Sequence, residues 1–147
     1  MGGSTWTPLV AIVGILYLAF IFSFGYKAVA NSDNQTSVTN ASRNAMTESV
    51  NLGNARGNEE VTINEEVAIE SAIRMYAASA DFSDGARYVN INDVKSDPAM
   101  IATESYLEVN TPLRPMLKFF NHNIDVVPDY TRSREIVIYE AKEINRK

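Results

Sequence analysis

Residues 9–24 read Leu9-Val-Ala-Ile-Val-Gly-Ile-Leu-Tyr-Leu-Ala-Phe-Ile-Phe-Ser-Phe24, an almost wholly apolar run, and the first charged side chain of the chain is Lys27. A helix that crosses the hydrocarbon layer of a bilayer, about 30 Å thick, needs roughly 20 apolar residues. Trp6 and Tyr26 bracket the run. At about 1.5 Å per residue they would lie about 30 Å apart on a helix, so both aromatic rings fit the headgroup levels. The run therefore predicts a helix that can span a membrane.

The predicted helix covers residues 8–30. We expect Thr7 to be its N-cap and Pro8 its first helical residue, where the missing N–H needs no partner. Gly14 and Ser23 lie inside the apolar run, and small side chains allow two helices to approach closely. We expect this surface to contact lipid and to support self-association. We call the residues assigned to this membrane and assembly surface its marker residues; they are Trp6, Pro8, Gly14, Tyr17, Phe20, Phe24 and Tyr26.

A cleaved signal peptide is the alternative interpretation of the N-terminus. Ala28-Val29-Ala30 has the small-x-small pattern that signal peptidase recognises. However, no Lys or Arg precedes the apolar run, and the run is long for a signal sequence. A retained helix is therefore the favoured interpretation.

The chain has 147 residues, and about 117 remain beyond the predicted helix, which is enough for one domain. Only Lys27 of the 13 Lys and Arg lies in the first 30 residues, so the remainder is acidic, with all 18 Asp and Glu. This charge argues against nucleic acid and against a second contact with anionic lipid. The absence of cysteine excludes a disulfide scaffold and thiolate metal sites. The few basic residues near the helix do not fix its orientation, but an Asn-, Ser- and Thr-rich composition favours a domain outside the cell.

Three regions are predicted: a membrane helix over 1–30, a polar extension over 31–60 and a globular domain over 61–147. The extension has poor helix propensity. It is either an exposed tether or the outer half of one long helix packed against copies of itself. A stripe of mostly small residues on one helical face favours the helix: Val38, Ala41, Ala45, Ser49 and Leu52.

Two local patterns mark the extension. Gly53 and Gly57 predict a break or turn. Asn34 and Asn40 begin glycosylation sequons, which chance explains in a segment so rich in Asn.

The domain is expected to begin with a second helix over residues 62–80. Thr62-Ile-Asn-Glu65 has the spacing of a capping box, and Asp84-Gly85 ends the unit as a turn. The apolar face of this amphipathic helix is predicted to comprise Ile69, Ala72, Ile73, Tyr76 and Ala80.

Beyond Gly85 the hydrophobic period changes to two, which predicts strands over 87–94, 100–109 and 133–141. Residues 116–120 form a short apolar element of undetermined type. Helices followed by strands that can pair antiparallel indicate an α+β fold with a small sheet of about three strands. A sheet this small needs one covered face, and the second helix is the natural cover.

Side-chain oxygens concentrate between residues 81 and 97, and calcium prefers such ligands. The spacing does not match a calcium-binding loop, so solvated turns are the favoured interpretation. The one histidine, His122, is expected in a surface loop. No phosphate-binding loop, nucleophile elbow or zinc-protease motif is present. The sequence predicts neither an enzyme nor a cofactor, and the weak metal candidates are Asp81, Asp84, Asp93 and Asp97.

In architecture the whole chain resembles type IV pilins, and its short length and helical front half are similar to TadE-like pseudopilins. The helix 8–30, the stripe Val38–Leu52 and the three predicted strands carry the likeness. The resemblance implies a hydrophobic helix that serves first as membrane anchor and later as filament core, with its outer half packed on a small antiparallel sheet. Most mature pilins carry Glu at the fifth residue, and counting from Ser4, Pro8 stands there instead.

The leading hypothesis is a structural, pilin-like subunit of an extracellular helical filament, held in the cell membrane by a single pass before assembly. Its expected partners are lipid and copies of itself. The alternative hypothesis is a single-pass membrane subunit of a secretion or conjugation complex in the cell envelope.

Overall fold

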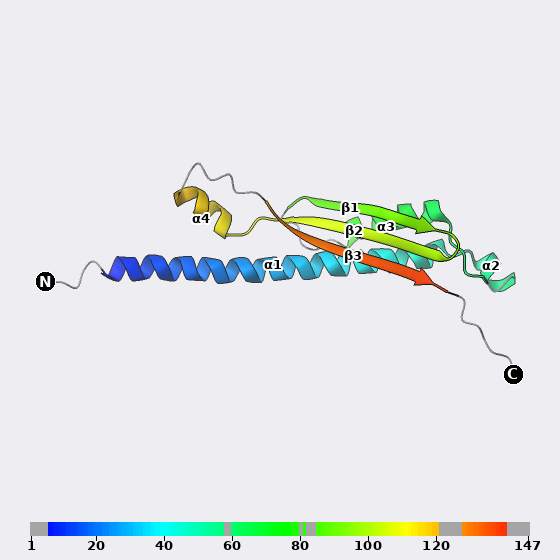
Figure 1. The fold of residues 1–147 in the computed structure, drawn as a ribbon, viewed down its shortest axis with the longest axis horizontal. Helices are drawn as coiled ribbons and strands as arrows, with labels where there is room; N and C mark the ends of the chain where they lie inside the picture. The colour runs from blue at the N-terminus through cyan, green and yellow to red at the C-terminus, as the bar shows by residue number, and fades with distance from the viewer. Residues whose placement is uncertain (1–5, 58–59, 80, 82–84, 121–127, 141–147) are drawn as a thin grey trace, which may run out of the picture.

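The computed structural model describes residues 6–57, 60–79, 81, 85–120 and 128–140. Its elements are, in order, α1 (Trp6–Ser49), α2 (Leu52–Gly57), α3 (Glu65–Ala78), β1 (Arg87–Lys95), β2 (Ala99–Val109), α4 (Leu113–Phe120) and β3 (Asp129–Tyr139). The three strands form one antiparallel sheet in the order β1-β2-β3. The α+β fold with a long apolar N-terminal helix and a three-stranded sheet is therefore confirmed (Figure 1).

Helix α1 is continuous for 44 residues and passes residue 30 without a break. At about 1.5 Å per residue it is about 66 Å long. The helix favoured for the polar extension is confirmed as far as Ser49, whereas Leu52 begins the separate α2. Thr7 lies inside α1 and not at its N-cap, because the helix already includes Trp6.

The C-terminal half of α1 packs against the sheet of the same chain. It lies against β2 and β3, while α3 packs beside it and reaches β1. The second helix, expected to be the natural cover of the sheet, contacts mainly β1 among the strands, and α1 is the main cover. The predicted stripe is buried at Val38, Ala41, Ala45 and Ser49, whereas Leu52 is exposed. The stripe is buried against α3 and the sheet of the same chain, so its expected packing against copies of itself is wrong.

The core is thin and follows the helix axis in three clusters. Ala30 packs with Leu107 and Val109 at the end nearest the apolar run. Val38 and Ala41 contact Tyr76 in the middle. Met46 lies in the largest cluster, with buried Ala, Ile and Val side chains of α3, β2 and β3 around it. Small residues on α1 let the helix approach the sheet closely, so few large side chains are needed to fill the space.

Helix α3 differs from its prediction in its cap and in its buried face. Its N-cap is Asn64, whose side chain accepts from the N–H groups of Glu66 and Val67, and not Thr62. The predicted apolar face is correct at Ala72 and Tyr76 but wrong at two isoleucines, as Ile69 and Ile73 are 39 % and 48 % exposed. Ala80 lies outside the described residues. The buried face instead includes Ala68 and Ser71, small side chains that allow close contact with α1.

β1 and β2 are each one residue longer than predicted, whereas β3 starts before and ends before the predicted range 133–141, at Tyr139. β2 has its predicted faces: Ile101, Thr103, Ser105, Leu107 and Val109 are all buried. β3 begins four residues before the predicted strand, at Asp129, because Asp129–Arg132 is a polar segment whose alternation is not hydrophobic. The undetermined element at 116–120 belongs to helix α4.

Candidate membrane and assembly surface

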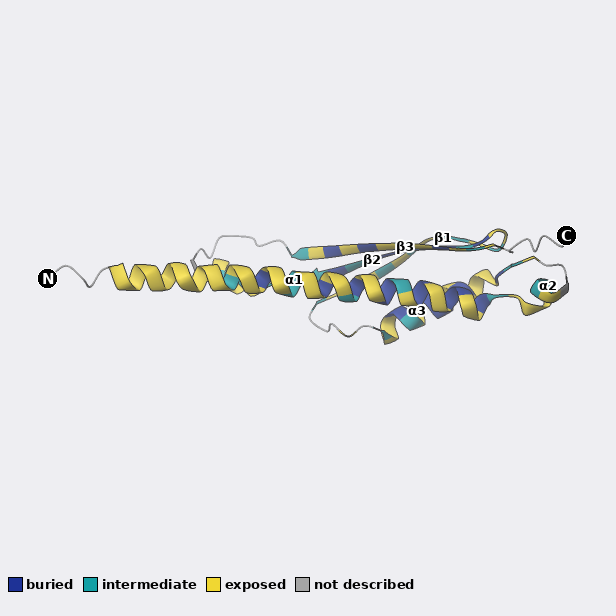
Figure 2. Cartoon of the chain, turned by 90° about the horizontal axis from the view of Figure 1, so that it is seen from below, coloured by how far each residue is buried: buried dark blue, intermediate teal, exposed yellow. Residues whose placement is uncertain are grey.

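The N-terminal half of α1 projects beyond the sheet as an exposed apolar rod. From Trp6 to Phe22 all residues are exposed except Ala19, which is half-buried (Figure 2). By length and composition, α1 is able to cross a membrane. Water does not stabilise so large a continuous apolar surface, and a surface of this kind marks contact with a membrane or with other proteins.

The marker residues lie on different parts of this rod. Trp6, Pro8, Gly14 and Tyr17 are exposed in its outer part, with Trp6 exposed by 74 %. Further along, Phe20 and Phe24 make an edge-to-face contact with ring centroids 4.7 Å apart, and both remain exposed. Tyr26 differs from the others, because it is half-buried and packs against the cluster of Ala30, Leu107 and Val109.

The rod joins the domain at Ser23 and Lys27 without an intervening spacer. The Ser23 hydroxyl donates to the Ala19 carbonyl (2.8 Å) and accepts from the Leu113 N–H (3.1 Å), which ties the start of α4 to α1. One turn further on, Lys27 Nζ lies 2.6 Å from Asp129 Oδ2 at the start of β3. The end of the sheet is therefore fixed to the end of the apolar run.

Beyond the junction, α1 meets the sheet through a buried polar seam, which we define as Asn34, Ser42, Tyr76, Thr103, Ser105 and Ser133. Asn34 is fully buried: its Oδ1 accepts from the hydroxyls of Tyr76 (2.8 Å) and Ser105 (2.9 Å), and its Nδ2 donates to Ser133 Oγ (3.3 Å). The hydroxyls of Ser42 and Thr103 are 2.6 Å apart. Polar side chains are stable in a core when they satisfy one another in this way. Burial also leaves Asn34 inaccessible as a glycosylation acceptor.

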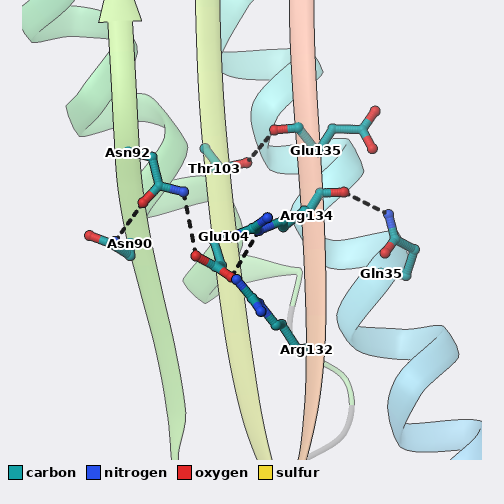
Figure 3. Close-up of polar contacts among 8 residues, drawn as sticks. All are labelled: Gln35, Asn90, Asn92, Thr103, Glu104, Arg132, Arg134 and Glu135. Atoms are coloured by element: carbon teal, nitrogen blue, oxygen red, sulfur yellow. Dashed lines mark hydrogen bonds and ion pairs between the residues drawn. The ribbon is translucent and has the colours of Figure 1, made fainter.

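The opposite face of the sheet carries a charged cluster around Glu104. Arg132 Nε and Arg134 Nε both donate to Glu104 Oε1, the latter at 3.0 Å, and Asn92 Nδ2 lies 3.5 Å from Oε2 (Figure 3). The Arg132 hydrogen bond is the main cause that lowers the pKa of Glu104 to about 2; Arg134, Tyr106 and Asn92 act in the same direction, and desolvation opposes them. This cluster is an ion-pair ladder across two strands, β2 and β3.

The metal candidates do not converge. Asp81 precedes β1 and Asp97 follows it, both exposed, so the length of the strand separates them. Asp93 is paired with Lys95 at 3.4 Å. Asp84 lies outside the described residues, as does His122. Within the part of the chain that the structure describes, no three His, Cys, Asp or Glu side chains form a group suited to a metal ion.

The roles of two residues, Ser23 at the junction and Asn34 in the seam, were not predicted from the sequence. Ser23 was recognised only as a small residue, although its hydroxyl holds α4. Asn34 was recognised only as part of a sequon. A usable signal existed for both: a lone hydroxyl in an apolar run, and an Asn in register with the buried Val38 and Ala41, each require a partner if buried.

Comparison with protein families gives one match over residues 1–142, to the family described as a domain of unknown function, DUF5411. The match covers most of the chain, so the chain belongs to this family. Comparison with curated proteins and with solved structures gives no match.

Proposed function

We propose that this protein is a structural, pilin-like subunit: a single-pass membrane protein whose N-terminal helix later packs with copies of itself in an extracellular filament. The observation that carries the proposal is the division of α1 into an exposed apolar half and a half that is clamped on the sheet. One rigid helix thereby presents a surface for lipid or sister helices at a fixed position relative to the domain.

The half of α1 that packs on the sheet, the clamped half, supports this role because it connects the helix mechanically to the domain. The Lys27–Asp129 ion pair, the half-buried Arg87–Asp33 pair (2.5 Å) and the polar seam attach α1 to all three strands or their ends. A load on the helix therefore acts on the whole domain and not on a flexible linker.

Gly14 supports self-association in particular. A Cβ atom added at this position would meet no heavy atom within 4 Å among the described residues, apart from its chain neighbours and the adjoining helix backbone. Glycine costs a helix roughly 1 kcal/mol relative to better helix formers, and no close contact within the described part of the chain requires it. Close approach of a second helix supplies a reason, since small residues let helix backbones come together.

The test compares Gly14→Leu with Val13→Leu in cells that express the full chain. Sheared extracellular material is pelleted, examined by electron microscopy and probed for the protein, and the membrane fraction is measured in parallel. We expect wild type and Val13→Leu to appear in filaments. Gly14→Leu should stay in the membrane at wild-type levels and lose most of its filament fraction, because leucine is bulkier and no less apolar.

Two results would overturn the proposal. The wild-type protein could be confined to membranes and co-purify in detergent with other polypeptides at fixed stoichiometry, which supports the envelope-complex alternative. Alternatively, Gly14→Leu could assemble as efficiently as Val13→Leu, which would show that close helix packing at this position is not used.

A further inference from the structure

Helix α4 lies beside α1 at the level of the apolar run and not at the level of the sheet (Figure 1). Its position is fixed by the hydrogen bond from the Leu113 N–H to Ser23 Oγ. Ser23 precedes Tyr26 by three residues, which is about 4.5 Å along a helix. If Trp6 and Tyr26 mark the headgroup levels, the start of α4 lies slightly inside the bilayer surface. Interfacial helices lie about 5–10 Å into this boundary.

The composition of α4 suits that depth. Leu113, Met116 and Leu117 have the i, i+3, i+4 spacing of one apolar face, and Leu117 is 38 % exposed. Arg114 and Lys118, four residues apart, lie on a different face. An amphipathic helix with basic residues on its polar side is typical of a segment that lies in the membrane interface.

Two adjoining hollows lie along α1: the first lies between α1 and α4, and the second lies on α1 beside Pro112, just before α4 begins. The first is lined by Tyr26, Asn110, Arg114 and Lys118 together with Thr111 and the two prolines beside them. The second is almost purely apolar and follows α1 along Phe22, Gly25 and Val29. Tyr26 and Pro112 border both hollows. A largely apolar hollow with two basic side chains at its wall, Arg114 and Lys118, that continues into an apolar groove matches the two ends of a phospholipid.

Charge in the first hollow comes mainly from Lys118. Arg114 already donates to Asn110 Oδ1 (2.7 Å) and lies 3.5 Å from Glu108 Oε1. Lys118 is exposed and forms no ion pair with a described residue. A lysine side chain can lay its apolar stem along the surface and extend its ammonium to the phosphate level.

We infer that α4 is an interfacial foot: it lies in the lipid headgroup region, and the hollow lined by Tyr26, Arg114 and Lys118 receives a phospholipid phosphate whose acyl chain follows the groove along α1. This inference rests on the membrane-anchored state of the proposed function. It also revises the expectation, drawn from the net negative charge, that the protein makes no second contact with anionic lipid. The net charge does not describe this end of the molecule, where Arg114 and Lys118 line the hollow.

The depth of α4 can be measured directly, because the chain contains no cysteine. Three single-cysteine variants of the full chain carry a nitroxide label: Leu16→Cys in the middle of the apolar run, Leu117→Cys on α4, and Ile138→Cys, an exposed position on the outer sheet face. Each is reconstituted in vesicles of phosphatidylcholine and phosphatidylglycerol. Accessibility of the label to oxygen and to a water-soluble nickel chelate gives its depth.

We expect the label at position 16 to be deepest, the label at 117 to be at the interface with a several-fold higher oxygen-to-nickel ratio than at 138, and the label at 138 to be aqueous. A label at 117 that is as aqueous as the label at 138, with position 16 deep, would show that α4 does not lie in the headgroup region, while α1 would still span the membrane. An aqueous label at position 16 would show that α1 does not span the membrane either.

The headgroup contact has its own test. Spin-labelled phosphatidylglycerol and phosphatidylcholine report which lipid the protein retains at its surface. Lys118→Gln should reduce the preference for phosphatidylglycerol by roughly five-fold, the effect of one basic residue near an anionic surface. Lys95→Gln, at the far end of β1, should not change it. An unchanged preference in Lys118→Gln would show that the hollow does not bind the phosphate.

Discussion

The two halves of α1 reverse the usual relation between polarity and burial. The half from Trp6 to Phe22 is apolar and exposed, whereas the half from Ala30 to Ser49 is rich in Ser, Asn and Thr and contains all but one of the buried residues of the helix (Figure 2). Residue polarity therefore does not identify which half packs in the fold. Size does, because the buried positions of the second half hold Ala, Ser, Asn, Val and Met, without an aromatic side chain.

The reversal has a physical reason in each half. A helix with small side chains can lie close to a sheet, and its hydroxyl and amide groups then reach partners on the strands. A helix with exposed Leu, Ile and Phe on all sides has no such partner among the residues that the structure describes, and a surrounding apolar phase stabilises it. The same helix thus belongs to two environments, an apolar phase and the core of the domain, and substitutions in the two halves are expected to change different properties of the protein.

The largest effect on the clamped half is expected from Met46→Ala. Met46 is fully buried in the largest cluster, and truncation of such a side chain costs about 2–5 kcal/mol of unfolding free energy. Denaturant unfolding of the full chain in detergent measures the loss. Leu18→Ala, at an exposed position of the apolar half, should leave the unfolding free energy of the domain within about 0.5 kcal/mol of wild type. Equal losses in the two variants would contradict the division of α1.

The converse change is Ile12→Lys in the apolar half. A lysine near the centre of a membrane-spanning helix costs roughly 2.5–3.5 kcal/mol. We expect a reduced fraction of protein that resists alkaline extraction from membranes, and loss of assembly. Domain unfolding in detergent should be unchanged, as Ile12 contacts no core cluster. Ile12→Leu is the matched control. Normal membrane retention and assembly of Ile12→Lys would show that the N-terminal half is not buried in either state.

The polar seam is expected to give the third effect. Asn34→Ala removes one acceptor from two hydroxyls and leaves Tyr76 and Ser105 without it. An unsatisfied buried group costs about 1–3 kcal/mol, so the unfolding free energy should fall by that amount. Asn40→Ala, at an exposed position of the same helix, should have little effect. Equal stability of the two variants would mean that the seam does not stabilise the attachment of α1.

Much of the fold could be predicted, and the failures share one cause. The long helix, the strand β2 with its buried odd-numbered face and the α+β class follow from periodicity. The side that α3 buries does not, because the hydrophobic pattern points to Ile69 and Ile73, whereas close packing on α1 selects Ala68 and Ser71. Hydrophobicity alone does not rank a small residue above a large one, and the arrangement of α1 beneath the sheet decides it.

Only part of the candidate surface could be predicted from the sequence, because its other contacts also depend on how α1 packs in the fold. The apolar run and its aromatic boundary at Trp6 are visible in sequence. The contact between Ser23 and Leu113 joins residues 90 positions apart, and no local pattern reports so distant a pair. Asn34 and Ser133 are separated by 99 positions. Both contacts depend on how α1 packs against elements distant in sequence, α4 in one case and β3 in the other, which becomes known only from the folded chain.

The smallest effect is expected from pH, and it distinguishes the two faces of the sheet. The seam on the inner face is built from uncharged groups, whereas Glu104 on the outer face has a pKa lowered from 4.5 to about 2, mainly by Arg132. The unfolded state therefore binds the proton more readily, and stability is lost as pH falls from about 4.5 to 2. Glu104→Gln should make the unfolding free energy less dependent on pH over this interval. Asn34→Ala should lower the curve without changing its shape, and the measurement is denaturant unfolding at several pH values. A pH dependence that is the same in Glu104→Gln and wild type would show that the ladder, which joins β2 and β3, does not stabilise the fold.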